Sequence, residues 1–140
     1  MTGKVRITVL VENTAQGAGI LAEHGLAFWI EWDGRNTLFD TGQGNILAEN
    51  AHRLNIPLHE ADAIVLSHGH YDHTGGLAEA LKTSRPVTVY AHPAAFAPKY
   101  ARKPDGSASE IGMPHLAERA VRSLHNRLVY TDQPTPVVDR

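Results

Sequence analysis

Four candidate metal ligands fall within six positions in the middle of the chain. They belong to the segment Ser-His-Gly-His-Tyr-Asp-His-Thr-Gly-Gly at residues 67–76. Imidazole and carboxylate groups are good ligands for borderline divalent ions. In an extended segment residues i and i+2 point the same way, so His68 and His70 can bind one ion. The adjacent Asp72 and His73 can turn to a second, and the spacing therefore predicts a two-ion site.

The elements around this segment place it at the end of a buried strand. Residues 63–66, Ala-Ile-Val-Leu, are a continuous apolar run that leads directly into it. A helical zinc site would need histidines at i and i+4, whereas Gly69 and the glycine pair at residues 75–76 indicate a loop. A short helix follows at residues 77–81. Loops on a rigid scaffold commonly carry catalytic ligands.

The rest of the chain predicts strands alternating with helices, in a βαβ-type order. Apolar runs on either side of Asp33-Gly34 predict an antiparallel hairpin, because Asp-Gly favours a tight turn. Proline-rich residues 98–114 are expected to form a long loop. We expect strands at residues 5–11, 26–32, 36–39, 63–66, 87–90 and 127–130, a further strand beginning at 135–138, and helices at 46–54, 77–81 and 116–124.

Composition excludes several classes of function. The chain has 140 residues, 42% hydrophobic and 20% charged, which suits one globular domain. Its 13 Lys and Arg against 15 Asp and Glu give a net charge of -2, so no nucleic acid partner is expected. The absence of cysteine excludes disulfides, thiolate zinc sites and cysteine nucleophiles. We see neither a signal peptide nor an apolar run of membrane-spanning length, and expect a cytoplasmic location without a membrane partner.

Two motifs in this order resemble those of the metallo-β-lactamase superfamily. Residues 68–73, His-Gly-His-Tyr-Asp-His, resemble its His-x-His-x-Asp-His motif, and residues 38–42, Leu-Phe-Asp-Thr-Gly, resemble its strand-ending Asp-Thr-Gly. Within the superfamily, residues 8–13, 67–76 and 102–107 look like the branch of dihydropterin-linked ribofuranosyl-aminobenzene phosphate synthases.

The resemblance implies an α/β (α+β) fold, either half of an αββα sandwich or a truncated one, with a mixed β-sheet. Residues 1–140 would form a single domain equivalent to the N-terminal half of the usual fold, which supplies further ligands from its second half. Residues 135–138 begin like a strand just before the sequence ends at Arg140, and this also suggests a half-fold.

The resemblance also implies a metal-dependent hydrolase. His68 and His70 would bind the first ion, and Asp72 and His73 the second. Asp72 would also be catalytic, by orienting a metal-activated hydroxide, and Asp40 would hold the ligand loops by hydrogen bonds. Two divalent ions are expected, zinc first, with iron and manganese as alternatives. The hydroxide would attack an ester, a phosphoester or a related bond of a small-molecule substrate.

Weaker candidates surround this constellation. Candidate substrate contacts are Asn13, His92, Arg102 and Lys103. Arg102 and Lys103 form a basic cluster with Lys99 that could hold a substrate phosphate, although a solvated loop is the simpler interpretation. Solvated or capping roles are expected for the remaining histidines: His24, His52, His59, His115 and His125.

A second function remains open at this point. The chain could be a noncatalytic metal-binding half-domain that acts by assembling with a partner chain. A half sandwich would expose the sheet face that normally packs on its mate, and a large apolar patch of this kind favours association. The alternatives for covering it are a homodimer and a missing C-terminal half.

Overall fold

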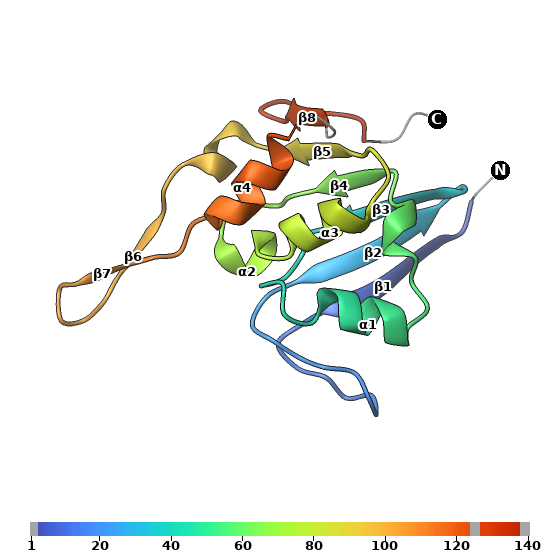
Figure 1. Ribbon diagram of the computed structural model, residues 1–140, viewed down its shortest axis with the longest axis horizontal. Coiled ribbons are helices and arrows are strands. Elements are labelled where there is room, and N and C mark those ends of the chain that lie inside the picture. Colours follow the sequence, from blue (N-terminus) through green and yellow to red (C-terminus); the bar gives the residue numbers. More distant parts are fainter. Residues whose placement is uncertain (1–2, 124–126, 138–140) are drawn as a thin grey trace.

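A six-stranded mixed sheet forms the centre of the computed structural model, which describes residues 3–123 and 127–137 (Figure 1). The strand order is β1-β2-β3-β4-β5-β8. The pairs β1–β2 and β2–β3 are antiparallel, and β3, β4, β5 and β8 run parallel to their neighbours. The strands are β1 (Val5–Val11), β2 (Ala27–Trp32), β3 (Arg35–Phe39), β4 (Ala63–Val65), β5 (Thr88–Ala91) and β8 (Arg127–Tyr130). The predicted strands at these places are confirmed.

Helices lie over one face of this sheet (Figure 1). The α-helices are α1 (Leu47–Arg53), α2 (Tyr71–Thr74), α3 (Leu77–Thr83) and α4 (His115–Val121). Two short 3₁₀ helices, η1 (Leu58–Glu60) and η2 (Pro93–Phe96), connect them to the strands. None of the helices in the described residues combines the length and apolar character that crossing a bilayer requires.

The core lies between the helices and a row of side chains that crosses the sheet. The strand register places Trp29 opposite Leu38, Leu38 beside Ile64, and Ile64 beside Val89. Each of these four side chains is at most 1% exposed, and they share one cluster with Leu77 of α3. Because side chains alternate between faces along a strand, this row also fixes which residues point the other way.

On the opposite face of the sheet β1 and β2 present apolar side chains, and no helix of residues 3–123 and 127–137 covers them (Figure 1). Here we define the open face by Val5, Ile7, Val9, Phe28 and Ile30. In β2, Phe28 and Ile30 alternate with the buried Ala27 and Trp29. Val5, Ile7 and Val9 are 47–59% exposed, and Ile7 pairs with Ile30 across the register. Exposed apolar area of this extent is unusual on a monomer and is what half of a two-sheet sandwich would show.

The Asp33-Gly34 hairpin forms as predicted. Both residues have positive φ, 50° and 75°, which matches the type I′ turn that suits the twist of paired strands. This turn fixes the β2–β3 register, and with it the residues that meet where β2 begins and β3 ends.

Two expectations for the rest of the chain are wrong. Residues 98–114 are not only loop, because β6 (Tyr100–Arg102) and β7 (Ala108–Glu110) pair into a hairpin that projects from the body (Figure 1). Its turn is closed locally, where the backbone and hydroxyl of Ser107 both donate to Asp105 Oδ1. Residues 135–137 form no strand, while residue 138, residue 124 of the expected helix, and His125 lie outside the described residues.

Asn50 ties α1 to the loop that joins β1 to β2. Its side chain is fully buried and completes three hydrogen bonds with backbone groups. Oδ1 accepts from Leu21 N at 3.0 Å, and Nδ2 donates to the carbonyls of Leu10 and Leu21, both at 2.8 Å. A buried side chain that satisfies three backbone groups stabilises a loop that has few apolar contacts of its own.

We expect Asn50→Ala to lower the free energy of unfolding by about 1 to 3 kcal/mol, since it leaves buried backbone groups without partners. Urea denaturation followed by circular dichroism measures this change. His52→Ala, at an exposed position of the same helix, should change the stability by less than about 0.5 kcal/mol. Equal effects of the two substitutions would contradict the role assigned to Asn50.

Candidate metal centre

The His-rich segment starts where β4 ends and continues into the single turn of α2. His70 has an extended backbone, with φ -78° and ψ 151°, and directly precedes α2. His70 is therefore extended, as expected, while Asp72 and His73 lie on a helical turn. This change of conformation lets four ligand-type side chains, two from each part, approach one another.

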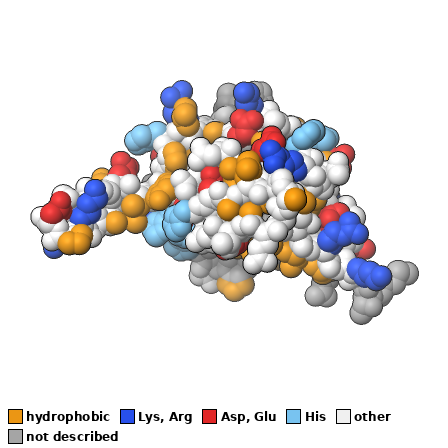
Figure 2. Space-filling model, turned by 90° about the horizontal axis from the view of Figure 1, so that it is seen from below, with side chains coloured by type: hydrophobic (Ala, Val, Ile, Leu, Met, Phe, Trp, Pro, Cys, Tyr) orange, Lys and Arg blue, Asp and Glu red, His pale blue; other side chains and the backbone are white. Residues whose placement is uncertain are grey.

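Their side chains come together at the surface beside α2. The rings of His68 and His70 are 4.5 Å apart between centroids, and those of His68 and His73 are 4.1 Å apart. His73 Nε2 lies 3.6 Å from Oδ2 of Asp72, which is only 8% exposed. Figure 2 shows histidine side chains gathered at the base of the β6–β7 projection.

Asp40 holds this cluster in place through hydrogen bonds. Its side chain is fully buried at the end of β3. Oδ1 accepts from Ser67 N at 2.8 Å, and Oδ2 accepts from Ser67 Oγ at 2.6 Å and from His73 Nδ1 at 2.8 Å. Ser67 Oγ in turn lies 2.8 Å from His68 Nδ1. A buried carboxylate is costly unless it is hydrogen-bonded in this way.

These bonds set the tautomers of two histidines. A carboxylate can only accept, so Nδ1 of His73 carries the proton that it donates to Asp40. Ser67 Oγ gives its own proton to Asp40, so Nδ1 of His68 donates to Ser67 Oγ. Both rings then leave Nε2 with a free lone pair, which is the state that a metal ligand needs.

Burial favours the same neutral state for His68. The pKa of His68 lies below the ordinary value of 6.5, first because burial disfavours the charged ring and then because His73 and His70 repel it. Asp40 and Asp72 oppose this shift without cancelling it. A proton therefore competes less with an ion for this ring.

The donor chemistry fits a divalent ion, since three imidazoles and one carboxylate are adjacent and two rings are hydrogen-bonded in the ligand tautomer. The side chains are nevertheless in contact with one another rather than arranged around a common point. Within residues 3–123 and 127–137, no group of three or more His, Asp or Glu side chains is placed so that it could hold an ion. The four side chains therefore fit a divalent ion in the type of their donor atoms and in their proximity, but they do not surround a common point.

His24 is a neighbour of the cluster that the sequence analysis missed. Its Nε2 lies 3.1 Å from Asp72 Oδ2, although His24 was expected to be simply solvated or capping. The predicted β2–β3 hairpin indicated that His24 would lie near the end of β3. Because Phe28 pairs with Phe39, the residues that precede β2 lie beside those that follow β3.

The candidate substrate contacts are placed differently from one another. Asn13 Oδ1 accepts from Gly25 N at 3.0 Å, next to His24. His92 caps η2, its Nδ1 accepting from Ala94 N at 3.1 Å. Arg102 and Lys103 are exposed on the β6–β7 projection, away from the cluster.

Lys99 is engaged in structure rather than in a basic cluster. Its Nζ donates to the carbonyls of Ala94 and Ala97 at 2.7 and 2.9 Å, which ties η2 to the base of the projection. The three basic residues grouped by the sequence are therefore separated in role, and only Arg102 and Lys103 present exposed cations.

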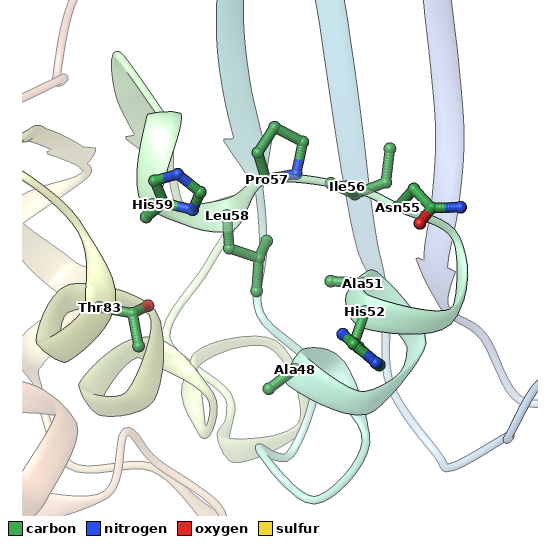
Figure 3. A pocket seen from close by; sticks show the side chains of 9 residues that line it. All are labelled: Ala48, Ala51, His52, Asn55, Ile56, Pro57, Leu58, His59 and Thr83. Carbon is green, nitrogen blue, oxygen red and sulfur yellow. The ribbon is translucent and has the colours of Figure 1, made fainter.

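A separate pocket of about 410 Å³ lies between α1, η1 and α3 (Figure 3). His52 and His59 stand on opposite sides of it, and the remaining lining is mostly apolar. The His-rich segment and Asp40 do not line this pocket, so it is not part of the candidate metal centre.

Comparison with known proteins identifies the family. Residues 21–137 match the metallo-β-lactamase superfamily. An uncharacterised protein of Methanocaldococcus jannaschii is 42% identical over 96 residues, covering 68% of this chain and 37% of that protein. The 7,8-dihydropterin-6-methyl-4-(β-D-ribofuranosyl)-aminobenzene-5′-phosphate synthase of the same organism is 34% identical over 108 residues, covering 72% and 37%. The chain belongs to the metallo-β-lactamase superfamily, and it resembles the expected branch.

Solved structures show the same fold. The metallo-β-lactamase fold protein YhfI from Bacillus subtilis matches with a TM-score of 0.62 at 17% identity, over 96% of this chain and 49% of that one. The short form of human tRNase Z matches with a TM-score of 0.51 at 24% identity, over 62% and 34%. The fold is thus α/β with a mixed sheet, consistent with half of the sandwich, and the chain spans 37% of the length of its two curated relatives.

We expect the metal-free protein to lose stability as the pH falls below 6.5, the ordinary value for His68. In that window the unfolded chain takes up a proton on His68 while the folded protein, with its lower pKa, resists it. The unfolded state then binds more protons, so the free energy of unfolding falls with pH. Urea denaturation in chelator between about pH 7 and pH 5 measures the slope.

His68→Gln should flatten this slope, because it removes the group whose pKa differs between the two states. His52→Gln, at an exposed position, is the matched control and should retain the slope of the unmodified protein. An unchanged slope in His68→Gln would show that other groups dominate.

Proposed function

We propose that the complete protein is a metal-dependent hydrolase of the metallo-β-lactamase superfamily, acting on an ester, phosphoester or related bond of a small molecule. The observation that carries this proposal is the Asp40 network, which leaves the Nε2 atoms of His68 and His73 unprotonated beside Asp72. Such an arrangement has a cost in buried charge that a purely structural role would not require.

The proposed roles follow from the placement of each side chain. His68 and His70 would hold one ion, and Asp72 with His73 the other. Bound divalent ions, zinc first with iron or manganese as alternatives, acidify water and stabilise developing negative charge. Asp72, nearly buried beside His73, would orient the attacking water, and Asp40 would keep the rings in their ligand tautomer.

The substrate class is proposed from the exposed cations and from one relative. Arg102 and Lys103 could hold a phosphate if the projection closes on a bound molecule, with His92 and Asn13 at the rim. The M. jannaschii synthase is named for a product that carries a 5′-phosphate on an aromatic riboside. Its similarity favours a synthase reaction as the second candidate activity, and both candidates share a phosphorylated small molecule as ligand.

The first test is metal content. We expect the full-length protein, purified without added metal, to hold about one to two equivalents of a transition metal, and His68→Ala/His70→Ala to lose at least one of them. Elemental analysis beside a protein assay measures this, with His52→Ala/His59→Ala as a control that removes two exposed histidines elsewhere. Less than about a tenth of an equivalent in the unmodified protein would contradict the metal-dependent function.

The open face supports the alternative of a half-domain that works by assembly. Val5, Ile7 and Val9 are the exposed members of an apolar surface that none of the described helices covers. In the described part of the 140 residues, these three side chains are 47–59% exposed. Association would bury these side chains, and burial of apolar surface favours it by about 25 cal/mol per Å².

We therefore expect the isolated 140-residue chain to run above its monomer mass of 15.2 kDa in sedimentation velocity, in a concentration-dependent way. Ile7→Lys/Val9→Lys should shift it toward monomer, because two desolvated charges would oppose the contact. His115→Lys, on the exposed side of α4, adds charge elsewhere and should not. A monomeric unmodified chain would contradict assembly through this face.

A further inference from the structure

We propose that His24 is a positioning residue of the metal centre, which holds the Asp72 carboxylate through a hydrogen bond from Nε2. This inference rests on the proposed metal-dependent function. The contact spans 3.1 Å, and the side chain of Asp72 is nearly buried while that of His24 is 63% exposed. The exposed ring of His24, which belongs to a different loop, therefore contacts Asp72, the carboxylate among the four candidate ligands.

The positions of the ring protons identify which histidine donates the hydrogen bond to Asp72. His73 Nε2 is 3.6 Å from the same Oδ2, but its ring proton lies on Nδ1, which donates to Asp40. In the tautomer with a single proton on Nδ1, Nε2 of His73 has no proton to give to Asp72. His24 does, in its Nε2-protonated tautomer, because a carboxylate oxygen accepts only from a protonated nitrogen. One oxygen of Asp72 is then fixed by His24, and the other remains available to an ion.

The backbone on both sides of His24 is held in place. Its carbonyl accepts from Gln43 Nε2 at 2.7 Å, and the neighbouring Glu23 accepts from Gln43 N at 2.9 Å through Oε1. Leu26 N donates to the carbonyl of Asp72 at 3.3 Å. These bonds tie the segment both to the end of β3 and to α2, so the ring of His24 starts from a fixed position.

Gly25 makes the close approach feasible. Its φ is +140°, which disfavours other residues, and a Cβ at this position would overlap the carbonyl oxygen of Asp72. The backbone beside His24 thus packs directly on the backbone of Asp72. A loop that only connected β1 to β2 would not need this contact, whereas a loop that delivers His24 to Asp72 does.

The expected effect of His24 on ion binding is specific to one of the two proposed ion positions. His24 contacts Asp72, the proposed ligand of the second ion, through Nε2 at 3.1 Å. Groups that hydrogen-bond a metal ligand typically contribute 10-fold to 100-fold to affinity. Loss of His24 should therefore weaken the second ion by about that factor and leave the first nearly unchanged.

The test is a titration of the metal-free, full-length protein with Zn²⁺ and separately with Co²⁺, by calorimetry and by Co²⁺ absorption. The variants are His24→Ala, His24→Gln and, as a matched control, His52→Ala. We expect His24→Ala to weaken the second equivalent about 10-fold to 100-fold and to change the Co²⁺ spectrum of that equivalent alone. His24→Gln keeps an N–H donor and should recover most of the affinity.

Each contrary outcome has its own meaning. Two equivalents of unchanged affinity in His24→Ala would overturn the positioning role while the proposed function stands. A His24→Gln protein as weak as His24→Ala would also overturn it, since the imidazole itself would then be required as a ligand. Failure of the unmodified protein to bind either ion would overturn the proposed function together with this inference.

Discussion

The buried carboxylate of Asp40 is the constraint on which the candidate site depends. It is fully buried, and it is stable there because Ser67 N, Ser67 Oγ and His73 Nδ1 satisfy its oxygens. These partners come from the end of β4 and from α2, so one side chain at the end of β3 holds both parts of the His-rich segment. It also accounts for the Nδ1 protons of both rings, and with them for the Nε2 atoms that we propose as ion ligands.

The two residues after Asp40 extend the same function to the neighbouring loop. The backbone and the hydroxyl of Thr41 both donate to the carbonyl of His73, at 2.8 and 2.9 Å. Gly42 N donates to the carbonyl of Leu26 at 2.9 Å. The Asp-Thr-Gly sequence therefore connects three segments, each through a different residue. Its position at the carboxyl end of a parallel strand is where α/β sheets usually gather functional loops.

The sequence correctly predicted the strands and the turn that depend on interactions between residues close together in the chain. Alternating apolar residues, the Asp33-Gly34 turn and the apolar run before His68 are short-range patterns, and the corresponding strands are present. The roles of Asn50 and His24 were missed because each depends on contacts with residues far along the chain, formed only when the sheet assembles. The metal ligands themselves remain a prediction, although the structure brings their side chains together.

The proposed ion ligands and the candidate substrate-binding cations lie in different parts of the chain. The proposed ligands lie in one continuous segment whose anchors, Asp40 and His24, belong to the same chain and the same end of the sheet. The candidate cations Arg102 and Lys103 lie instead on a projecting hairpin. The anchors of the proposed ligands thus lie within these 140 residues, whereas the apolar side chains Val5, Ile7 and Val9 of the open face are exposed.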